Sequence, residues 1–472
     1  MKKITIHLLF AWLVWGLSSP IVKAQPQVLT LQECLDKALE YNKSLSASKL
    51  KLEQARFGMK GYKANFFPQM NLMALDFYST VKGNFNLAGG HLPIYNYVES
   101  LGQFVPNITQ NADGTYTLNQ YADFPSQSMK WKLKNMLVAG VSMMEPLYSG
   151  GKITAAYDMS KLGVGMANEN IRLTESEVMV KTHEAYYLAV KAKELGEVAR
   201  AYKTLLVELK KNVDGAFRHG MSTRNDMMKV QVKLNEAELS IQKADNGSRL
   251  ALMNLCHIIG MPLDTPVDVL IDTVFVSPSE QGANATGTGI SSRPEYTILE
   301  QKSEMARQQV KLAKSDLLPS VTVGATYIYA NGGELAGKKF LDNGSVTVGV
   351  AVNMPIDLFG GTTSKVRSAR AAYQIAQLEQ QDLNEQMQLE LAQCQNLYQE
   401  AQTELHLCDV ALEQAAENVR LSRQQYEVGF ESLSDLLQTQ AMWQQCNADR
   451  VNARCQLRLS YIKLLRASGN LR

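Results

Sequence analysis

Residues 345–361 read SVTVGVAVNMPIDLFGG. Val346 and every second residue up to Met354 are apolar, whereas Thr347 and every second residue up to Asn353 are small or polar. This period of two is typical of a strand whose faces meet different surroundings, because successive side chains of a strand face opposite ways. The alternation ends at Pro355, and a helical period begins after Gly360 and Gly361. The segment therefore predicts a strand that leads into a long helix.

The same order of strand, proline, glycine pair and helix occurs at residues 135–151. Further positions recur at a spacing of 209 to 210 residues, which indicates an internal duplication. The recurring pairs are Pro146 with Pro355, Gly150 and Gly151 with Gly360 and Gly361, Phe217 with Tyr426, Gly220 with Gly429, and Asp226 with Asp435.

Each repeat is predicted to contain a helix, two strands, a long helix and a returning helix. The first repeat covers residues 25–260, a connector covers 261–292, and the second repeat covers 293–472. Apolar periodicity, helix caps and glycine stops set the boundaries. The predicted helices are 30–65, 152–217, 223–259, 293–317, 362–427 and 432–468, and the predicted strands are 67–79, 134–148, 320–329 and 345–356.

The first 24 residues are predicted to be a secretory signal peptide. Lys2 and Lys3 precede a short apolar core, and Val22-Lys23-Ala24 resembles a cleavage site. An N-terminal membrane anchor is the alternative, but the apolar core is short for a membrane span. Removal of three lysines would take the formal charge from +2 to −1. An exported chain of nearly neutral charge is a poor candidate for nucleic-acid binding.

The cysteines pose the question of disulfides in an exported chain. Six cysteines are present, and all six are expected to be buried helix residues. Cys394 and Cys408, like Cys446 and Cys455, are too far apart along one helix to form a disulfide. A bond between Cys408 and Cys455 across a helical hairpin remains open.

Catalytic and metal-binding motifs are absent from the sequence. His183-Glu184 lacks the second histidine of a zinc-protease motif, and no serine-hydrolase motif occurs. Residues 332–338, GGELAGK, match most of a phosphate-binding loop, but Lys339 replaces the required serine or threonine. The sequence predicts no enzyme, no cofactor and no metal site.

Four strands with one apolar face are too few to close a membrane barrel, since the smallest barrels have about eight strands. Open strand edges are not tolerated in lipid, so several chains would have to share one barrel. Eight, twelve or sixteen strands would come from two, three or four chains. At about 1.5 Å per residue, each long helix would extend for roughly 100 Å. A helix of that length cannot be the core of a compact domain.

The sequence resembles the TolC-type outer-membrane efflux proteins. The resemblance covers nearly the whole predicted mature chain and rests on duplicated features in a fixed order. These are the helix starts Asn42-Lys43-Ser44-Leu45 and Arg293-Pro294-Glu295-Tyr296, Pro68 and Pro319, the two Pro-Gly-Gly strand exits, and the turns Phe217-Arg218-His219-Gly220 and Tyr426-Glu427-Val428-Gly429.

The resemblance implies an α+β membrane protein in the outer membrane of a Gram-negative cell. Three chains would form one twelve-stranded β-barrel in the lipid, continued by a long α-helical barrel in the periplasm. The duct would passively conduct substrates received from a periplasmic adaptor and an inner-membrane transporter, in drug efflux or in type I secretion. The exported substrate is not specified by the sequence.

The resemblance also implies roles for single residues. Adaptor docking is expected at Gly220, Thr223, Asp226, Gly429, Ser432 and Asp435, and a pore constriction at Tyr426 and Asp435. Glu431 stands where the family often has a basic residue, and Gln438 where it often has an acidic one. Helix capping alone would also explain Asp226 and Asp435. The barrel-to-helix joints are Pro146, Gly150, Gly151, Pro355, Gly360 and Gly361.

A periplasmic coiled-coil scaffold without a pore is the alternative function. Such a scaffold would explain the long helices, but it leaves the two pairs of strands unexplained.

Overall fold

The computed structural model describes residues 27–271 and 290–471. The predicted signal peptide and residues 272–289 of the predicted connector lie outside this part of the chain. The chain divides into two compact units, and each is described by itself. The first holds residues up to 59, 159–307 and 370 onward, and the second holds Lys60–Asp158 and Gln308–Ala369.

The long and the returning helices of the two repeats match in length. The two long helices have 67 residues each, and the two returning helices have 35 residues each. Each long helix therefore extends for about 100 Å. The helices are α2 (Leu31–Tyr41), α3 (Lys43–Ala64), α4 (Lys152–Arg218), α5 (Arg224–Ile258), α7 (Pro294–Ser315), α8 (Gly361–Glu427) and α9 (Leu433–Ala467), with a short 3-10 helix at Ile290–Ser292.

The helix predicted at 30–65 is two helices rather than one. It breaks at Asn42, whose backbone is extended at ψ 127°. The Asn42 side chain accepts a 2.9 Å hydrogen bond from the amide of Ser44 and donates one of 2.9 Å to the carbonyl of Ile258. Asn42 thus caps α3 and ties the break to the end of α5, which favours two helices over a continuous one.

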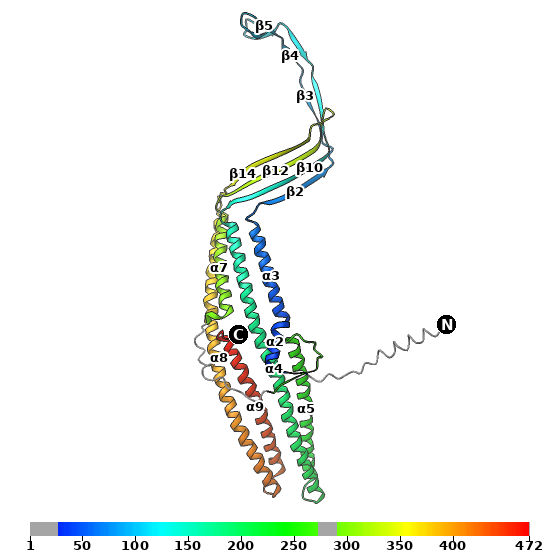
Figure 1. Ribbon diagram of the computed structural model, residues 1–472, viewed down its shortest axis with the longest axis vertical. Helices are drawn as coiled ribbons and strands as arrows, with labels where there is room; N and C mark the ends of the chain where they lie inside the picture. Colours follow the sequence, from blue (N-terminus) through cyan, green and yellow to red (C-terminus); the bar gives the residue numbers. More distant parts are fainter. Residues whose placement is uncertain (1–26, 272–289, 472) are drawn as a thin grey trace, which may run out of the picture. The chain divides into compact units, whose positions relative to one another are not determined.

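The sheet lies in the second unit, and its main strands run side by side in Figure 1. β10 (Gln127–Ser149) pairs with β2 (Gln69–Phe77) and β12 (Ser320–Leu335), and β12 pairs with β14 (Asp342–Asn353), all antiparallel. β10 begins at 127 rather than at 134, and β12 ends at 335 rather than at 329. Both strands are longer than predicted because β3 (Lys82–Leu87) and β13 (Lys338–Lys339) pair with their extensions.

Register separates the two faces of this sheet. One row of directly opposed residues across the four strands is Leu72, Val141, Tyr327 and Val346. The next row is Asn71, Ser142, Thr326 and Thr347, and it faces the other way. Met73 and Leu75 break the pattern on the second face. The apolar face is open to solvent in the single chain, and Leu72 is 82% exposed and Val346 70%.

The long connection between the predicted strands 67–79 and 134–148 contains several short strands. β4 (Gly90–Pro93) pairs with β9 (Tyr121–Phe124), β5 (Tyr95–Val98) with β6 (Gln103–Pro106), and β7 (Ile108–Gln110) with β8 (Tyr116–Leu118). Two hairpins branch from one stem, joined by backbone hydrogen bonds among Ile94, Asn107, Asn119 and Gln120. Alternating aromatic residues and turn residues produce these strands. The strands were not predicted, because the composition of the segment resembles that of a loop.

The first unit has two main apolar clusters. One surrounds Leu29, Tyr186 and Leu255, where β1 (Gln27–Leu29) pairs in parallel with β11 (Val267–Val269). The other packs α4 and α5 against α9 around Leu206, Val230 and Leu436. Among the described residues, none of the helices is both long and apolar enough to cross a membrane.

All six cysteines are free and lie on helices, so the bond considered between Cys408 and Cys455 is not formed. The expectation that all six are buried is wrong for Cys394, Cys408 and Cys446, which are half-buried. These three lie on α8 and α9, which pack along only part of their circumference.

Candidate functional site

The two turns between long and returning helices have the same backbone design. Gly220 has φ 76° and Gly429 has φ 84°, the left-handed conformation that ends a helix. Beyond Gly220, the amide of Met221 donates a 2.8 Å hydrogen bond to the carbonyl of Ala216. Beyond Gly429, the amide of Phe430 donates one of 2.9 Å to Gln425. We call the two turns, with the first turn of α5 and of α9, the hairpin tips.

Each returning helix begins with the predicted cap. The amide of Asp226 donates 3.2 Å to the Thr223 hydroxyl, and the Asp226 carboxylate accepts from the Thr223 amide at 3.3 Å and hydroxyl at 2.7 Å. Ser432 caps α9: its hydroxyl accepts a 3.3 Å hydrogen bond from the amide of Asp435 and donates one of 2.6 Å to the Asp435 carboxylate. The hydrogen bond from the Thr223 side chain is the main reason that the pKa of Asp226 lies below its usual value.

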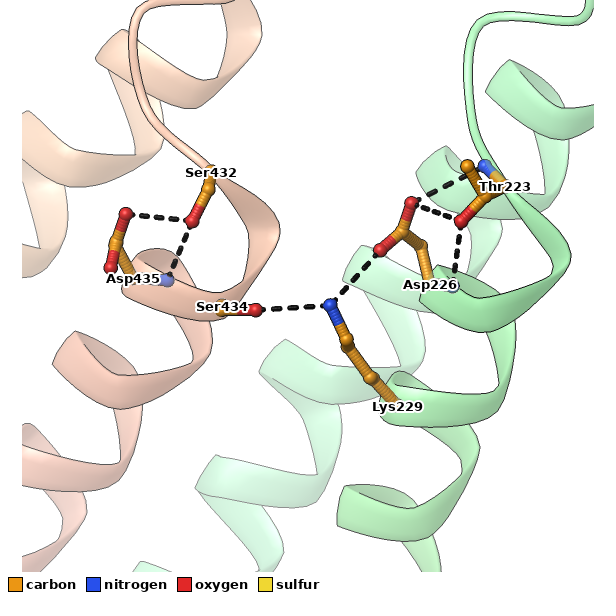
Figure 2. Close-up of polar contacts among 6 residues, drawn as sticks. All are labelled: Thr223, Asp226, Lys229, Ser432, Ser434 and Asp435. Atoms are coloured by element: carbon orange, nitrogen blue, oxygen red, sulfur yellow. Dashed lines mark hydrogen bonds and ion pairs between the residues drawn. The ribbon is translucent and has the colours of Figure 1, made fainter.

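Lys229 joins the two tips, and sequence reasoning missed it. Its ammonium group lies 3.4 Å from the Asp226 carboxylate and donates a 3.1 Å hydrogen bond to the hydroxyl of Ser434 at the start of α9 (Figure 2). The spacing of Asp226 and Lys229 on one helix suggests the first contact. The contact with Ser434 comes from the other repeat, and no local pattern indicates it.

The residues predicted to form the constriction have different surroundings. Tyr426 is half-buried against the cluster around Leu206, and burial is the main cause that raises its pKa, followed by the charge of Asp226. Asp435 is exposed, and its side chain bonds Ser432. Tyr426 is therefore a packing residue within this chain, whereas Asp435 faces solvent.

Glu431 does not take part in a link between the tips. Its carboxylate accepts a 2.6 Å hydrogen bond from Ser422, which is buried on α8. The second carboxylate oxygen of Glu431 is buried and has no hydrogen-bond partner in the described part of the chain. The positive charge between the two tips therefore comes from Lys229 and not from position 431. Gln438 is exposed and uncharged.

An exposed apolar side chain follows each tip glycine. Met221 is 77% exposed and Phe430 is 88% exposed. These two residues occupy equivalent positions in the two repeats, directly after Gly220 and Gly429. Large apolar side chains that are this exposed are candidates for contact with another protein. Their repetition could have been noticed in the sequence.

The joints between strands and long helices lie in the second unit. Pro146 lies inside β10, and the register shifts between Pro146 and Tyr148. This irregularity accommodates a residue that has no amide hydrogen to donate. Gly150 and Gly151 both have positive φ, and a Cβ on Gly150 would lie 2.8 Å from the carbonyl oxygen of Ser315.

The second joint is built differently. Pro355 follows the end of β14, and Gly360 has φ 71°. Gly361 is the first residue of α8 and lacks a positive φ. Gly360 therefore matches Gly150 in its backbone conformation, whereas Gly361 does not match Gly151. The Asp357 carboxylate accepts hydrogen bonds from the amides of Thr362 and Thr363 at 3.2 and 2.8 Å. Asp357 thus caps α8.

Groups of three or more possible metal ligands do not occur in the residues that the structure describes.

The comparisons with known proteins agree with the fold. Residues 290–470 match the family model described as outer membrane efflux protein. Outer membrane protein TolC of Vibrio cholerae is 21% identical over 379 residues, which are 79% of this chain and 84% of that protein. The alkaline protease secretion protein AprF of Pseudomonas aeruginosa is 26% identical over 240 residues, 49% of this chain and 48% of that protein.

The resemblance to TolC-type outer-membrane efflux proteins is confirmed. The outer membrane protein VceC from Vibrio cholerae has a similar structure, with a TM-score of 0.72 at 17% identity over 93% of this chain and 96% of that one. The CmeC outer membrane channel of Campylobacter jejuni has a TM-score of 0.70 at 16% identity over 93% and 86% of the two chains. The mixed helix and sheet fold is therefore that of the outer-membrane efflux channels.

Proposed function

We propose that this chain is the outer-membrane duct of a tripartite efflux or type I secretion system. Three copies share one twelve-stranded barrel in the lipid, and their helices continue it as a tube in the periplasm. The duct conducts solutes passively. A periplasmic adaptor and an inner-membrane transporter supply the solute and the energy.

The main support for this proposal is a sheet that has one apolar face, one polar face and two open edges. The row Leu72, Val141, Tyr327 and Val346 forms an apolar face, and the row Asn71, Ser142, Thr326 and Thr347 forms a polar face. An apolar face against lipid and a polar face against water are what a membrane barrel wall requires. A soluble scaffold would leave the exposed apolar row without a partner.

Copies of this chain supply the missing strand partners. β2 and β14 each pair with a single strand among the described residues, so the sheet has two open edges. Open edges in lipid cost several kcal/mol per unsatisfied backbone group, and a closed barrel removes them. Three chains of four strands each make a barrel of twelve, the number that the resemblance implies. The duplicated helices then line a tube of matching symmetry.

The hairpin tips are the proposed meeting place with the adaptor. Both tips have a glycine, an exposed apolar residue and a pair of capping residues. In the first tip these are Gly220, Met221, and Thr223 with Asp226. In the second tip they are Gly429, Phe430, and Ser432 with Asp435. Asp435 lies near the entrance of the tube and interacts with passing charges.

Membrane fractionation followed by electrical recording tests this function. The full chain should sediment with outer membranes, resist extraction by carbonate, and form ion-conducting channels after reconstitution into planar bilayers. Recovery in the soluble periplasmic fraction, or insertion without any conductance, would support the pore-free scaffold instead.

A further inference from the structure

Four lysines gather at the end of the sheet that is opposite the strand ends leading to the helices. A row of directly opposed residues crosses four strands, in the order Lys82 on β3, Lys132 on β10, Glu334 on β12 and Lys339 on β13. Lys130 lies two residues before Lys132, on the same face of β10. We call these five residues the rim row. Four lysines against one glutamate give the rim row a net charge of +3.

This arrangement costs stability. Lys82 and Lys132 are directly opposed, and like charges in that position destabilise a strand pair. Glu334 lies 2.7 Å from Lys132, and both side chains remain partly exposed. One carboxylate cannot neutralise four ammonium groups. A cluster that weakens the local pairing is better explained by the binding of a negatively charged group than by folding.

The rim row lies on the face of the sheet that carries the polar residues. Along β12, Glu334 has the same parity as Thr322 and Thr326, which belong to the polar face. The residues that point the other way at this level are apolar: Trp131 opposes Gly83 and Leu335, and Met129 opposes Phe85. A Cβ on Gly83 would lie 2.8 Å from the Trp131 ring, which shows how closely that ring covers the strand.

A cavity at this level gives three of the four lysines a common space. Its volume is about 690 Å³, and Lys82, Lys130, Lys132 and Glu334 line it together with Trp131, whereas Lys339 does not reach it. The acidic groups closest in register, Asp76 and Asp342, share one row on the other face, and Asp342 accepts a 2.6 Å hydrogen bond from Tyr329. The excursion between residues 83 and 129 contains neither lysine nor arginine. Positive charge is therefore concentrated at the rim row.

We propose that the rim row is an anion-binding site at the outer mouth of the duct, and that it favours the exit of negatively charged solutes. This inference rests on the proposed function, because the polar face becomes the lumen wall only in a closed barrel. Three copies would place three rim rows around one opening. A mouth lined by a single sign of charge raises the local concentration of the opposite ion.

The test uses block of the channel by inorganic tripolyphosphate. Full-length protein is reconstituted into bilayers of neutral phosphatidylcholine, which contain no lipopolysaccharide, and tripolyphosphate is added to either side. Block should be stronger from the side of the sheet mouth. Lys82→Glu should weaken this block by about tenfold or more, because two units of charge change at each copy of the site.

Lys338→Glu is the matched control. Lys338 is exposed and lies at the same level of the sheet, but it opposes Leu335 and so faces the other way. It should change the block by less than about twofold, because it lies outside the lumen. Equal effects of the two variants, or no block from either side of a conducting channel, would overturn the proposal.

Lipopolysaccharide is the other source of phosphate groups at the outer mouth of the duct. If the rim row binds lipid phosphate instead, Lys82→Glu would reduce retention of lipopolysaccharide on the purified protein and leave tripolyphosphate block unchanged. That outcome would also overturn the proposal. Failure of the wild-type chain to conduct at all would refute the proposed function itself, so the two failures can be told apart.

Discussion

Lys229 on α5 donates a 3.1 Å hydrogen bond to Ser434 on α9, and this bond joins the two hairpin tips of one chain. The same ammonium group lies 3.4 Å from Asp226 on its own helix. Lys229 is partly exposed, so the contact is weak enough to break without disrupting the cluster around Leu206. A polar link of this kind can hold the tips together and still release them.

Lys229→Ala should loosen the tips. We expect a higher open probability of the reconstituted channel, by several-fold, because a contact of about 1 kcal/mol that is present only in the closed arrangement shifts the equilibrium by roughly fivefold. Single-channel recording measures this. Lys233→Ala is the control, since the ion pair of Lys233 among the described residues is with Glu236 on the same helix, at 2.8 Å. An equal rise in both variants would argue against the link.

The cap at Asp226 predicts a dependence on pH. Its pKa in the folded chain is lowered, mainly by the hydrogen bond from Thr223. A carboxylate with a lowered pKa stabilises the fold at all pH values above the usual range of aspartate, and this contribution is lost as pH falls through the lowered pKa. Hydrogen exchange of residues 219–227 should therefore be slower in wild type than in Asp226→Asn at neutral pH.

The difference should be about fivefold at neutral pH, as expected for a cap worth about 1 kcal/mol, and it should vanish in strong acid. Asp435→Asn gives a comparison at the second tip. That variant should also change the conductance, because Asp435 is exposed whereas Asp226 is held by Thr223 and Lys229. A conductance that is the same in Asp435→Asn and wild type, with a lower melting temperature, would assign Asp435 to capping alone.

Phe430 and Met221 should carry adaptor binding. Replacing both with Ser should weaken capture of the periplasmic adaptor by tenfold or more, since exposed apolar anchors often contribute 1 to 2 kcal/mol each. Binding of purified adaptor to detergent-solubilised protein measures the loss. Leu250→Ser is the control, because Leu250 is 63% exposed on α5 but lies well away from the tip. Undiminished capture by the double variant would remove these residues from the interface.

Gly150 should tolerate no side chain. It has φ 63°, and its Cβ would lie 2.8 Å from the carbonyl oxygen of Ser315, so Gly150→Val should block assembly. Gly349→Val is the control, because Gly349 has open space around it. At the second joint, Gly360→Val should impair assembly more than Gly361→Val, since only Gly360 has a positive φ. Detergent-resistant oligomers on gels report the result, and assembly of Gly150→Val would contradict it.

Local patterns were sufficient to predict most of the helices and main strands. The predicted long helix 152–217 is observed as Lys152–Arg218, because apolar periodicity and a terminal glycine are local signals. The caps at Thr223 and Ser432 were predictable for the same reason. The break at Asn42 was missed because one of its supports, the carbonyl of Ile258, lies more than 200 residues away.

Contacts between repeats could not be read from the sequence. The bond between Lys229 and Ser434 joins residues from different repeats, and so does the rim row from Lys82 to Lys339. Their partners are set by strand register and helix packing, which a single sequence does not specify. Glu431 was recognised as unusual, but its burial beside Ser422 became visible only in the structure.

The number of chains in the assembly tests the central claim most directly, because four strands per chain cannot close a barrel. Native mass spectrometry of the full-length protein, extracted from outer membranes in mild detergent, measures this number. We expect particles of three chains that remain intact until β2 or β14 is altered at its open edge. Particles that contain a single chain and still conduct ions would contradict the shared barrel.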